Sequence, residues 1–420
     1  MHYPPPNSPT RPGTTVPRAL TPLAKPSKQS ATSRLTTINR RLVPGWTCST
    51  HVFRGATPRE SLPPGPRAVA PSEMTKAERR AQADAKFDHI TRLRREVAMG
   101  SRVEANNNAM WIVANRYVPD KPRASAVTLV LAHATGFHKE IWETTLRFLV
   151  TAGGIDEIWS LDAANHGDSA LLNKDSLGDI YEWSDHARDI LSFLTYYLPD
   201  RIDNPEPSLV QIPDQTSQRR LEHGFANRTV IGIGHSFGGC TIARAAIEFP
   251  KLFSSLVLVD PVIFPSYAPR GPGIEALIKG ALSRRDQWAN RESAQIGFAQ
   301  SAFFKAWHPD VLADYIQHGI TEDDQTEAVS FGENMRLPCE VWELLPTLDE
   351  RVSVKWIMDS TDCAQTGGPE LTQHTVWRRP ANSTNIQIKG AGHLIPQEAP
   401  EALAREILGF IRKDGVKSKL

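Results

Sequence analysis

The sequence has 420 residues, of which 40% are hydrophobic, and its formal net charge is +1 at pH 7. That length predicts one large domain with a lid, or two domains. The near-zero net charge gives no reason to expect nucleic acid or an acidic membrane surface as a partner. No run of 18 apolar residues exists, so we expect no transmembrane segment. The four cysteines share no paired spacing, and we expect no disulfide framework, no metal site and no cofactor.

The N-terminal residues 1–71 are rich in Pro, Ser, Thr and Arg, and no acidic residue precedes Glu60. This composition predicts a disordered arm. A mitochondrial targeting arm and a gene start extended beyond a true start at Met74 are alternatives. The first residues form no hydrophobic signal core, so we do not expect export. Residues 72–107 are predicted to form a helix and a lead-in, because Thr75-Lys76-Ala77-Glu78 has the form of a capping box.

Apolar strands alternate with helices over residues 108–412. The predicted strands are 110–118, 126–132, 155–161, 229–233, 256–259, 352–357 and 385–388, and the predicted helices include 141–152, 180–198, 241–249 and 398–411. Near-continuous apolar strands separated by helices indicate an α/β fold with a mostly parallel sheet that is covered on both faces.

A mostly helical insertion, at about 262–350, lies between two of these strands and is predicted to cap the sheet. It contains several aromatic residues, which are Phe264, Trp288, Phe298, Phe303, Phe304, Trp307 and Trp342. Most of these side chains are expected to pack the cap onto the body. One or two are candidates to line a pocket for an apolar acyl group.

The segment Gly234-His235-Ser236-Phe237-Gly238 lies between a predicted strand and a predicted helix. A serine at such a turn is held in a strained backbone conformation with its hydroxyl exposed above the sheet. Glycines are required beside it because the helix folds back against the strand. Ser236 is therefore predicted to be a nucleophile.

A serine nucleophile needs a base, a carboxylate and an oxyanion hole. His393 follows the last predicted strand within Gly390-Ala391-Gly392-His393, which is the place expected for the base. Asp362 follows the penultimate strand and Asp260 follows the strand before it. Either carboxylate can reach His393, so both remain candidates, as do cap or turn roles for each.

The turn His133-Ala134-Thr135-Gly136 follows the first long buried strand. We expect the backbone N–H of Ala134 or Thr135 to be one oxyanion donor, and that of Phe237 to be the other. A second turn contains Asp162 and His166. These two side chains are expected to tie loops together rather than to do chemistry.

Together these motifs resemble the α/β-hydrolase superfamily over about residues 108–412. The resemblance extends to a fungal branch that includes the yeast peroxisomal lipase and the hydrolases of Alternaria host-selective toxin (AK-toxin type) biosynthesis. It is carried by the segments Asn165–Ala170, Trp183–Ile190, Gly234–Gly239 and Asp260–Ile263. In this branch an acidic residue regularly precedes a Pro-Val pair, which favours Asp260 over Asp362. The resemblance implies a role in peroxisomal lipid or secondary-metabolite metabolism.

The chain finishes in a polar tail, 413–420, whose last residues are Ser418-Lys419-Leu420. This tripeptide is a peroxisomal address, so we expect a peroxisomal protein that an import receptor binds. The predicted activity is a serine hydrolase acting on an ester or thioester of an apolar acyl group, a small-molecule substrate. An acyltransferase using the same site and a catalytically silent ligand-binding relative are the alternatives.

Overall fold

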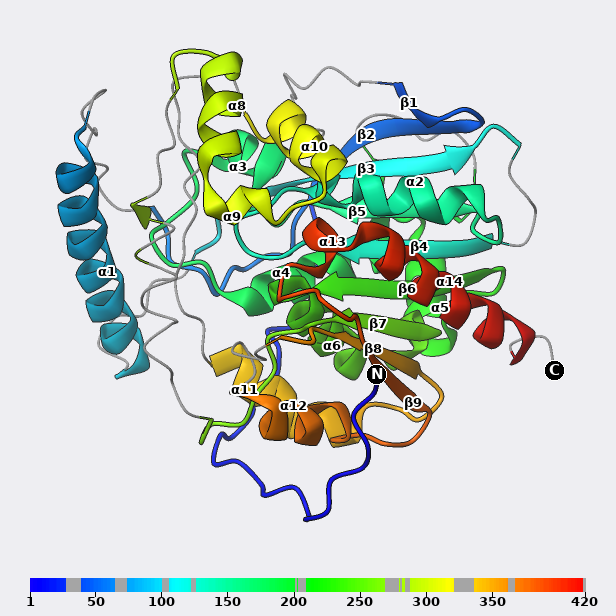
Figure 1. Ribbon diagram of the computed structural model, residues 1–420. Helices are drawn as coiled ribbons and strands as arrows, with labels where there is room; N and C mark the ends of the chain where they lie inside the picture. Colours follow the sequence, from blue (N-terminus) through cyan, green and yellow to red (C-terminus); the bar gives the residue numbers. More distant parts are fainter. Residues whose placement is uncertain are drawn as a thin grey trace.

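The computed structural model describes residues 1–27, 39–64, 74–99, 106–121, 126–200, 202, 209–268, 279, 282–283, 288–320, 336–361 and 367–417. These residues contain a nine-stranded sheet in the order β1-β2-β3-β5-β4-β6-β7-β8-β9 (Figure 1). Strands β4 to β9 run parallel to one another, and β1, β2 and β3 form an antiparallel edge. The strands are β1 Arg40–Val43, β2 Trp46–Arg54, β3 Trp111–Pro119, β4 Ala126–Ala132, β5 Glu157–Leu161, β6 Arg228–His235, β7 Ser255–Val259, β8 Ser353–Met358 and β9 Ser383–Gln387.

Helices cover both faces of this sheet, as expected of buried parallel strands. The helices are α1 Lys76–Ala98, α2 Glu143–Thr151, α3 Gly167–Asn173, α4 Trp183–Ser192, α5 Asp214–His223, α6 Phe237–Glu248, α8 Arg291–Gln300, α9 Ala302–Lys305, α10 Pro309–Gly319, α11 Arg336–Leu344, α12 Pro369–Val376, α13 Ile395–Glu398 and α14 Pro400–Lys417. Helices α2 and α14 pack on one face. Helices α4, α6 and α11 pack on the other, where their apolar side chains form the larger core.

The predicted mostly parallel sheet, with helices on both faces, is confirmed. Each apolar run between residues 110 and 388 that was predicted as a strand forms one of β3 to β9, with shifts of a few residues at the ends. The capping box of α1 is also present, since the Thr75 side chain accepts from the N–H of Glu78 and the Glu78 side chain accepts from the N–H of Thr75. Local signals therefore place these elements correctly.

The prediction of a disordered arm over residues 1–71 is wrong for a large part of that range. Residues 40–54 form β1 and β2, and β2 pairs with β3 along nine consecutive residues. Trp46, Cys48 and Phe53 of β2 are buried. The surrounding Pro-rich composition hid this nine-residue strand, whose main partner, β3, comes from a distant part of the chain.

Residues 1–27, which we call the N-terminal belt, lie along the outside of the body (Figure 1). The belt begins at β9, where the carbonyl of Met1 accepts from the N–H of Gln387 at 2.7 Å. It continues past α12 and α11, where the Arg18 guanidinium donates to Glu340 at 2.8 Å. It reaches the β2 side of the molecule, where Arg54 donates to the Ser27 hydroxyl at 2.6 Å. The belt thus connects elements from one end of the sheet to the other.

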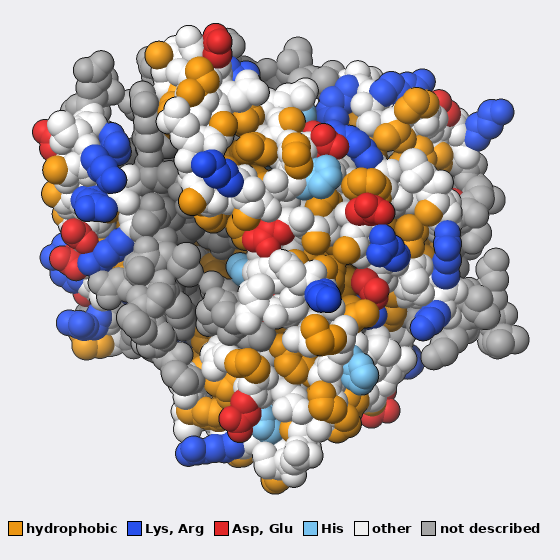
Figure 2. Space-filling model, in the orientation of Figure 1, with side chains coloured by type: hydrophobic (Ala, Val, Ile, Leu, Met, Phe, Trp, Pro, Cys, Tyr) orange, Lys and Arg blue, Asp and Glu red, His pale blue; other side chains and the backbone are white. Residues whose placement is uncertain are grey.

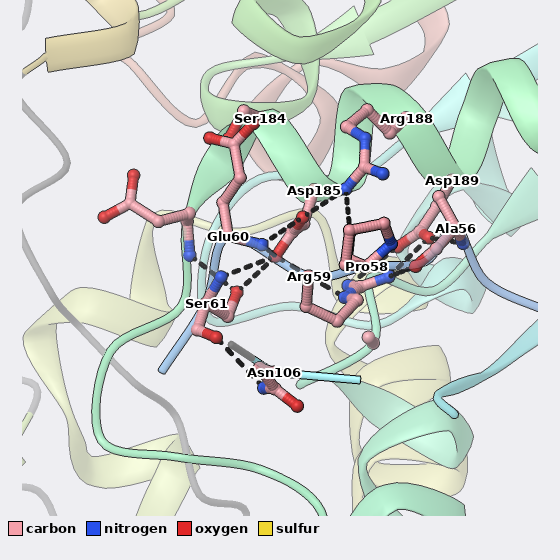
Figure 3. A network of polar contacts seen from close by, with 12 residues as sticks. Ala56, Pro58, Arg59, Glu60, Ser61, Asn106, Ser184, Asp185, Arg188 and Asp189 are labelled. Carbon is pink, nitrogen blue, oxygen red and sulfur yellow. Dashed lines mark hydrogen bonds and ion pairs between the residues drawn. The ribbon is translucent and has the colours of Figure 1, made fainter. Parts of the chain in front are cut away.

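A buried network of charges fastens residues 56–61 to α4 (Figure 3). The Arg59 guanidinium lies 2.6 Å from an oxygen of Asp189 and 3.4 Å from an oxygen of Asp185. Asp185 also accepts from the backbone N–H of Ser61 at 2.8 Å, and Asp189 accepts from that of Ala56 at 2.8 Å. These charges are fully buried, so their mutual pairing is what makes their burial tolerable.

The described part of the predicted cap consists of α8, α9 and α10, which lie over one end of the sheet (Figure 1). Helix α11 was expected in the cap but packs on α6 in the body, where Trp342 is fully buried. On the face shown in Figure 2, positive and negative side chains are interspersed, in keeping with the net charge of +1. Among the helices that the structure describes, none is both long and apolar enough to span a membrane.

Candidate active site

Ser236 lies at the turn between β6 and α6, with φ 54° and ψ −115°. This sparsely populated conformation stores about 1–3 kcal/mol of strain, which the surrounding structure must offset. A Cβ on Gly234 would lie 2.3 Å from the carbonyl oxygen of Gly238, and one on Gly238 would lie 2.3 Å from that of Ala132. The two glycines therefore permit the close packing that keeps the serine in this conformation.

The structure brings Ser236, His393 and Asp260 into one hydrogen-bonded chain. The Nε2 of His393 lies 2.9 Å from the Oγ of Ser236, and its Nδ1 lies 2.5 Å from the Oδ2 of Asp260. Ser236 is 6% exposed and Asp260 2% exposed, whereas the His393 side chain is 21% exposed. This is the arrangement in which a carboxylate orients an imidazole that can take the proton of a serine hydroxyl.

Asp260 reaches this position because it directly follows β7. Its backbone has φ 37°, its N–H donates to the carbonyl of Ile357 at 2.8 Å, and its Oδ1 accepts from the N–H of Asp359 at 3.4 Å. The non-glycine residues with positive φ in the described ranges are Ser236, Asp260 and Asn382, so two of the three belong to this chain of contacts. Asp362, the other candidate, lies outside the described residues.

The loop that carries His393 is held by side chains that the sequence did not single out. The N–H of Gly390 donates to the Ser360 hydroxyl at 2.8 Å, and the N–H of Gly392 donates to Glu398 at 2.6 Å. His235, the residue before the serine, lies with its Nε2 2.8 Å from the carbonyl oxygen of His393. Sequence spacing gave no signal for Ser360 or Glu398, whereas the position of His235 beside Ser236 was visible.

The predicted oxyanion donors belong to two segments that pack closely together, the start of α6 and the turn that contains Ala134 and Thr135. A Cβ on Gly238 would also lie 2.6 Å from the carbonyl oxygen of His133, so the start of α6 packs directly on this turn. Phe237 is the first residue of α6, and N–H groups of a first helical turn have no acceptor within the helix. The N–H of Phe237 therefore directly follows Ser236 without an acceptor inside α6, and the roles of Phe237, Ala134 and Thr135 as oxyanion donors stay a prediction.

Two histidines hold that turn in place. The Nε2 of His166 accepts from the N–H of Gly136 at 3.0 Å, and the Nε2 of His133 accepts from the N–H of Ala163 at 3.0 Å. Burial lowers the pKa of the His133 imidazole to about 4, and lowers the pKa of His166 and of His186 well below the usual value. All three rings lie near Phe237 and are neutral at pH 7. As expected, His166 ties loops together.

A buried lysine secures the other end of the turn. Lys139 lies 3.0 Å from Asp162, 2.5 Å from Asp168 and 2.9 Å from Glu140. Burial opposes charge on this lysine, but the three carboxylates outweigh burial and hold the pKa of the ammonium group well above its usual value. Asp162 also accepts from the Lys139 N–H at 2.7 Å, so it has the tying role that the sequence predicted.

Cap helix α10 packs against the residues that follow the turn. The ring of Phe137 lies 5.6 Å from that of Trp307 and 6.2 Å from that of Tyr315. Tyr315 also stacks on His138, at 5.5 Å. The predicted aromatics Phe298 and Phe304 belong to the same cluster. The cap therefore presents aromatic rings to Phe137 and His138, which follow the turn.

A surface depression of about 380 Å³ lies between α8 and α10, and its lining contains no member of the Ser236–His393–Asp260 chain. Arg291 lines it, but its guanidinium donates to carbonyl oxygens of Ile316, Gln317 and Ile320. Arg291 therefore caps the C-terminal end of α10. In the described ranges, no group of three or more His, Cys, Asp or Glu residues is arranged to hold a metal ion.

Residues 129–406 match the model of the Alpha/beta hydrolase family. The Saccharomyces cerevisiae peroxisomal membrane protein LPX1 is 26% identical over 332 residues, covering 71% of this chain and 78% of the relative. The type I acyl-CoA thioesterase mpaH of Penicillium brevicompactum is 34% identical over 182 residues, which cover 42% of this chain and 35% of that enzyme. The abhydrolase domain-containing protein ACTT2 of Alternaria alternata is 38% identical over 105 residues, covering 24% and 38%.

The solved structures agree with this assignment at the level of the fold. The structure of the peroxisomal alpha-beta-hydrolase Lpx1 from Saccharomyces cerevisiae superposes with a TM-score of 0.61 at 20% identity, covering 89% of this chain and 91% of that one. The family match extends over more than half of the sequence and includes the turn at Ser236 and the loop at His393. The chain belongs to the alpha/beta hydrolase family, as its motifs predict, and is a hydrolase.

Proposed function

We propose that this protein is a serine hydrolase that cleaves esters or thioesters of apolar acyl groups through an acyl-enzyme. The observation that carries the proposal is the continuous chain from Ser236 Oγ through His393 to Asp260. It stands at a strained turn next to two predicted oxyanion donors. The match to acyl-CoA thioesterases over part of the chain supports a thioester as one substrate class.

In the proposed reaction, Ser236 Oγ attacks the acyl carbon while the Nε2 of His393 takes its proton. The charge that develops on the carbonyl oxygen is stabilised by the N–H of Phe237 and by that of Ala134 or Thr135. Asp260 stabilises the imidazolium through Nδ1–H. The proton of His393 then passes to the leaving alkoxide or thiolate, and the acyl group remains on Ser236. A water molecule, deprotonated by His393, releases the acid and restores the serine.

The aromatic cluster of the cap supports an apolar acyl group. Phe137 is three residues from Ala134, and it contacts Trp307 and Tyr315 of the cap. We expect an acyl chain attached to Ser236 to extend towards these rings, where burying each CH₂ would contribute about 0.8 kcal/mol. Rates on acyl-CoAs and p-nitrophenyl esters of graded chain length measure this preference. Rates independent of chain length would contradict it.

Labelling with a fluorophosphonate probe tests the serine. Wild-type protein is expected to be labelled at Ser236, and the Ser236→Ala variant is not. The His393→Ala variant is expected to label slowly, because the hydroxyl lacks its base. A wild-type protein that does not react, or a Ser236→Ala variant that reacts equally, would refute the proposal. Product analysis with an added alcohol or thiol separates hydrolysis from acyl transfer, since a transferase forms the new ester.

We further propose that the protein acts in the peroxisome, in lipid or secondary-metabolite metabolism. The support is the final Ser418-Lys419-Leu420 and the peroxisomal relative in yeast. Import is expected to be lost when these three residues are deleted from a fluorescently tagged full chain. A deleted chain that still enters peroxisomes would contradict the role of this signal.

A further inference from the structure

His235 connects the serine turn directly to the loop of the base. It precedes Ser236 in the chain, and its Nε2 lies 2.8 Å from the carbonyl oxygen of His393. The centroids of the two imidazole rings are 5.2 Å apart. His235 is 1% exposed, so water does not compete for this contact. The side chain of His235 therefore joins the turn that carries Ser236 to the loop that carries His393, whose relative positions the proposed reaction requires.

The contact defines the protonation of His235. Burial lowers the pKa of this imidazole well below its usual value, so the ring is neutral and carries one proton. A carbonyl oxygen can only accept, so that proton is on Nε2. The Nδ1 atom is buried and has no partner among the described residues. The Nε2–H of His235 therefore donates to the carbonyl oxygen of His393, which is the polar contact of this ring among the described residues.

The other contacts of the loop hold residues on either side of His393, since the carbonyl oxygen of Leu394 accepts from the N–H groups of Gln397 and Glu398 at 2.9 and 2.8 Å. Ser360 holds Gly390 and accepts nothing from His393 itself, and Glu398 holds Gly392. Asp260 holds the Nδ1 side of the ring. Among the described residues, the His235 side chain is the polar side chain that contacts the carbonyl oxygen of His393 itself.

We propose that His235 is a positioning residue that holds the peptide of His393 so that its Nε2 stays on the Ser236 hydroxyl. This inference rests on the proposed serine-hydrolase function. Because His235 is part of the same turn as the nucleophile, a shift of the turn carries the base loop with it. Misplacement of a catalytic group by about 1 Å can reduce a rate by about 10²-fold.

The test compares variants at position 235 by their kcat, KM and fluorophosphonate labelling rate. His235→Phe keeps an aromatic ring but has no donor, and it is expected to lose about 10²-fold in kcat with KM unchanged. His235→Gln keeps an N–H near the position of Nε2 and is expected to recover most of that rate. His235→Asn is polar but too short, and it is expected to behave like the Phe variant.

A matched control is His51→Phe, a buried histidine of β2 at the antiparallel edge of the sheet, which is expected to leave kcat unchanged. Equal rates for wild type and His235→Phe would overturn the inference, as would equal losses for the Gln and Phe variants. These results differ from a failure of the proposed function, in which the wild-type serine does not label at all. Thermal unfolding of each variant separates loss of rate from loss of fold.

Discussion

The Oδ2 of Asp260 lies 2.5 Å from the Nδ1 of His393, although 133 residues separate them in the chain. The contact forms because Asp260 ends β7 and the loop of His393 follows β9, so the carboxyl ends of parallel strands converge at one edge of the sheet. The carboxylate is thus one strand closer to Ser236 than a residue that follows β8. This geometry favours Asp260 as the third member of a catalytic triad.

The Asp260→Asn variant is expected to lose about 10⁴-fold in kcat, because an amide stabilises the wrong tautomer of the imidazole. Steady-state hydrolysis of a p-nitrophenyl ester measures the loss. Asp362→Asn is the matched comparison and is expected to keep most of the activity. If only the Asp362 variant loses several orders of magnitude, the assignment of Asp260 is wrong.

The close packing at Gly238 predicts that a single methyl group there damages the proposed oxyanion site. In Gly238→Ala, the new Cβ meets the carbonyl oxygens of Ala132 and His133 at 2.3 and 2.6 Å, so α6 and the turn must separate. Loss of one oxyanion donor reduces kcat by about 10²–10³. Gly409→Ala is the control, since nothing lies within 4 Å of its Cβ, and it is expected to stabilise α14 by up to about 1 kcal/mol. Wild-type activity in the Gly238 variant would contradict this account.

Buried neutral histidines predict a stability that falls in acid. The folded-state pKa of His186 is lowered by burial, so below about pH 6.5 the unfolded chain binds a proton that the folded chain does not. Each such histidine therefore removes about 1.4 kcal/mol of unfolding free energy per pH unit as pH falls below about 6.5. For His133 the loss ends near its folded pKa of about 4.

His186→Phe tests this linkage, because neither ring nitrogen of His186 has a partner among the described residues. The variant keeps the stacking on Phe237, and its unfolding free energy is expected to depend less on pH between 6.5 and 5. Urea denaturation at each pH gives the slope. An unchanged slope would show that His186 is protonated in the folded protein.

The N-terminal belt is predicted to stabilise the body. Deleting residues 2–27 removes the ion pair of Arg18 with Glu340 and uncovers β9, so the melting temperature is expected to fall by several degrees. Deletion of Ser418–Leu420 is the control and is expected to leave it unchanged. A belt deletion with wild-type stability and protease resistance would instead support a dispensable or targeting segment.

The network in Figure 3 predicts the largest loss of stability. Asp189→Ala leaves the buried Arg59 guanidinium without one of its two carboxylates, which costs about 3–5 kcal/mol. Chemical denaturation measures the difference in unfolding free energy. Asp175→Ala, at an exposed position, is expected to change it by less than about 0.5 kcal/mol. A loss at Asp189 no greater than at Asp175 would show that the pairing contributes nothing.

The sequence predicted the parallel strands, the serine turn and the loop that places His393 beside Ser236, because each has a local signal. Buried strands appear as apolar runs, and Gly234 and Gly238 mark a turn that tolerates no Cβ. Strand β2 escaped prediction because its burial depends on pairing with β3, about 60 residues away. Spacing alone left Asp260 and Asp362 open, since both residues follow strands. The family resemblance favoured Asp260, and its contact with His393 supports that preference.

The positive φ angles of Ser236 and Asp260 have a consequence for how this chain can change over generations. Glycine at either position would relieve backbone strain. The side chains that the proposed reaction needs are therefore not the ones that give the most stable fold. A gene copy no longer selected for hydrolysis would be able to gain stability there by a single substitution to glycine. Such a step abolishes the proposed triad. A descendant of this protein with glycine at either position is therefore expected to have lost the proposed hydrolase activity.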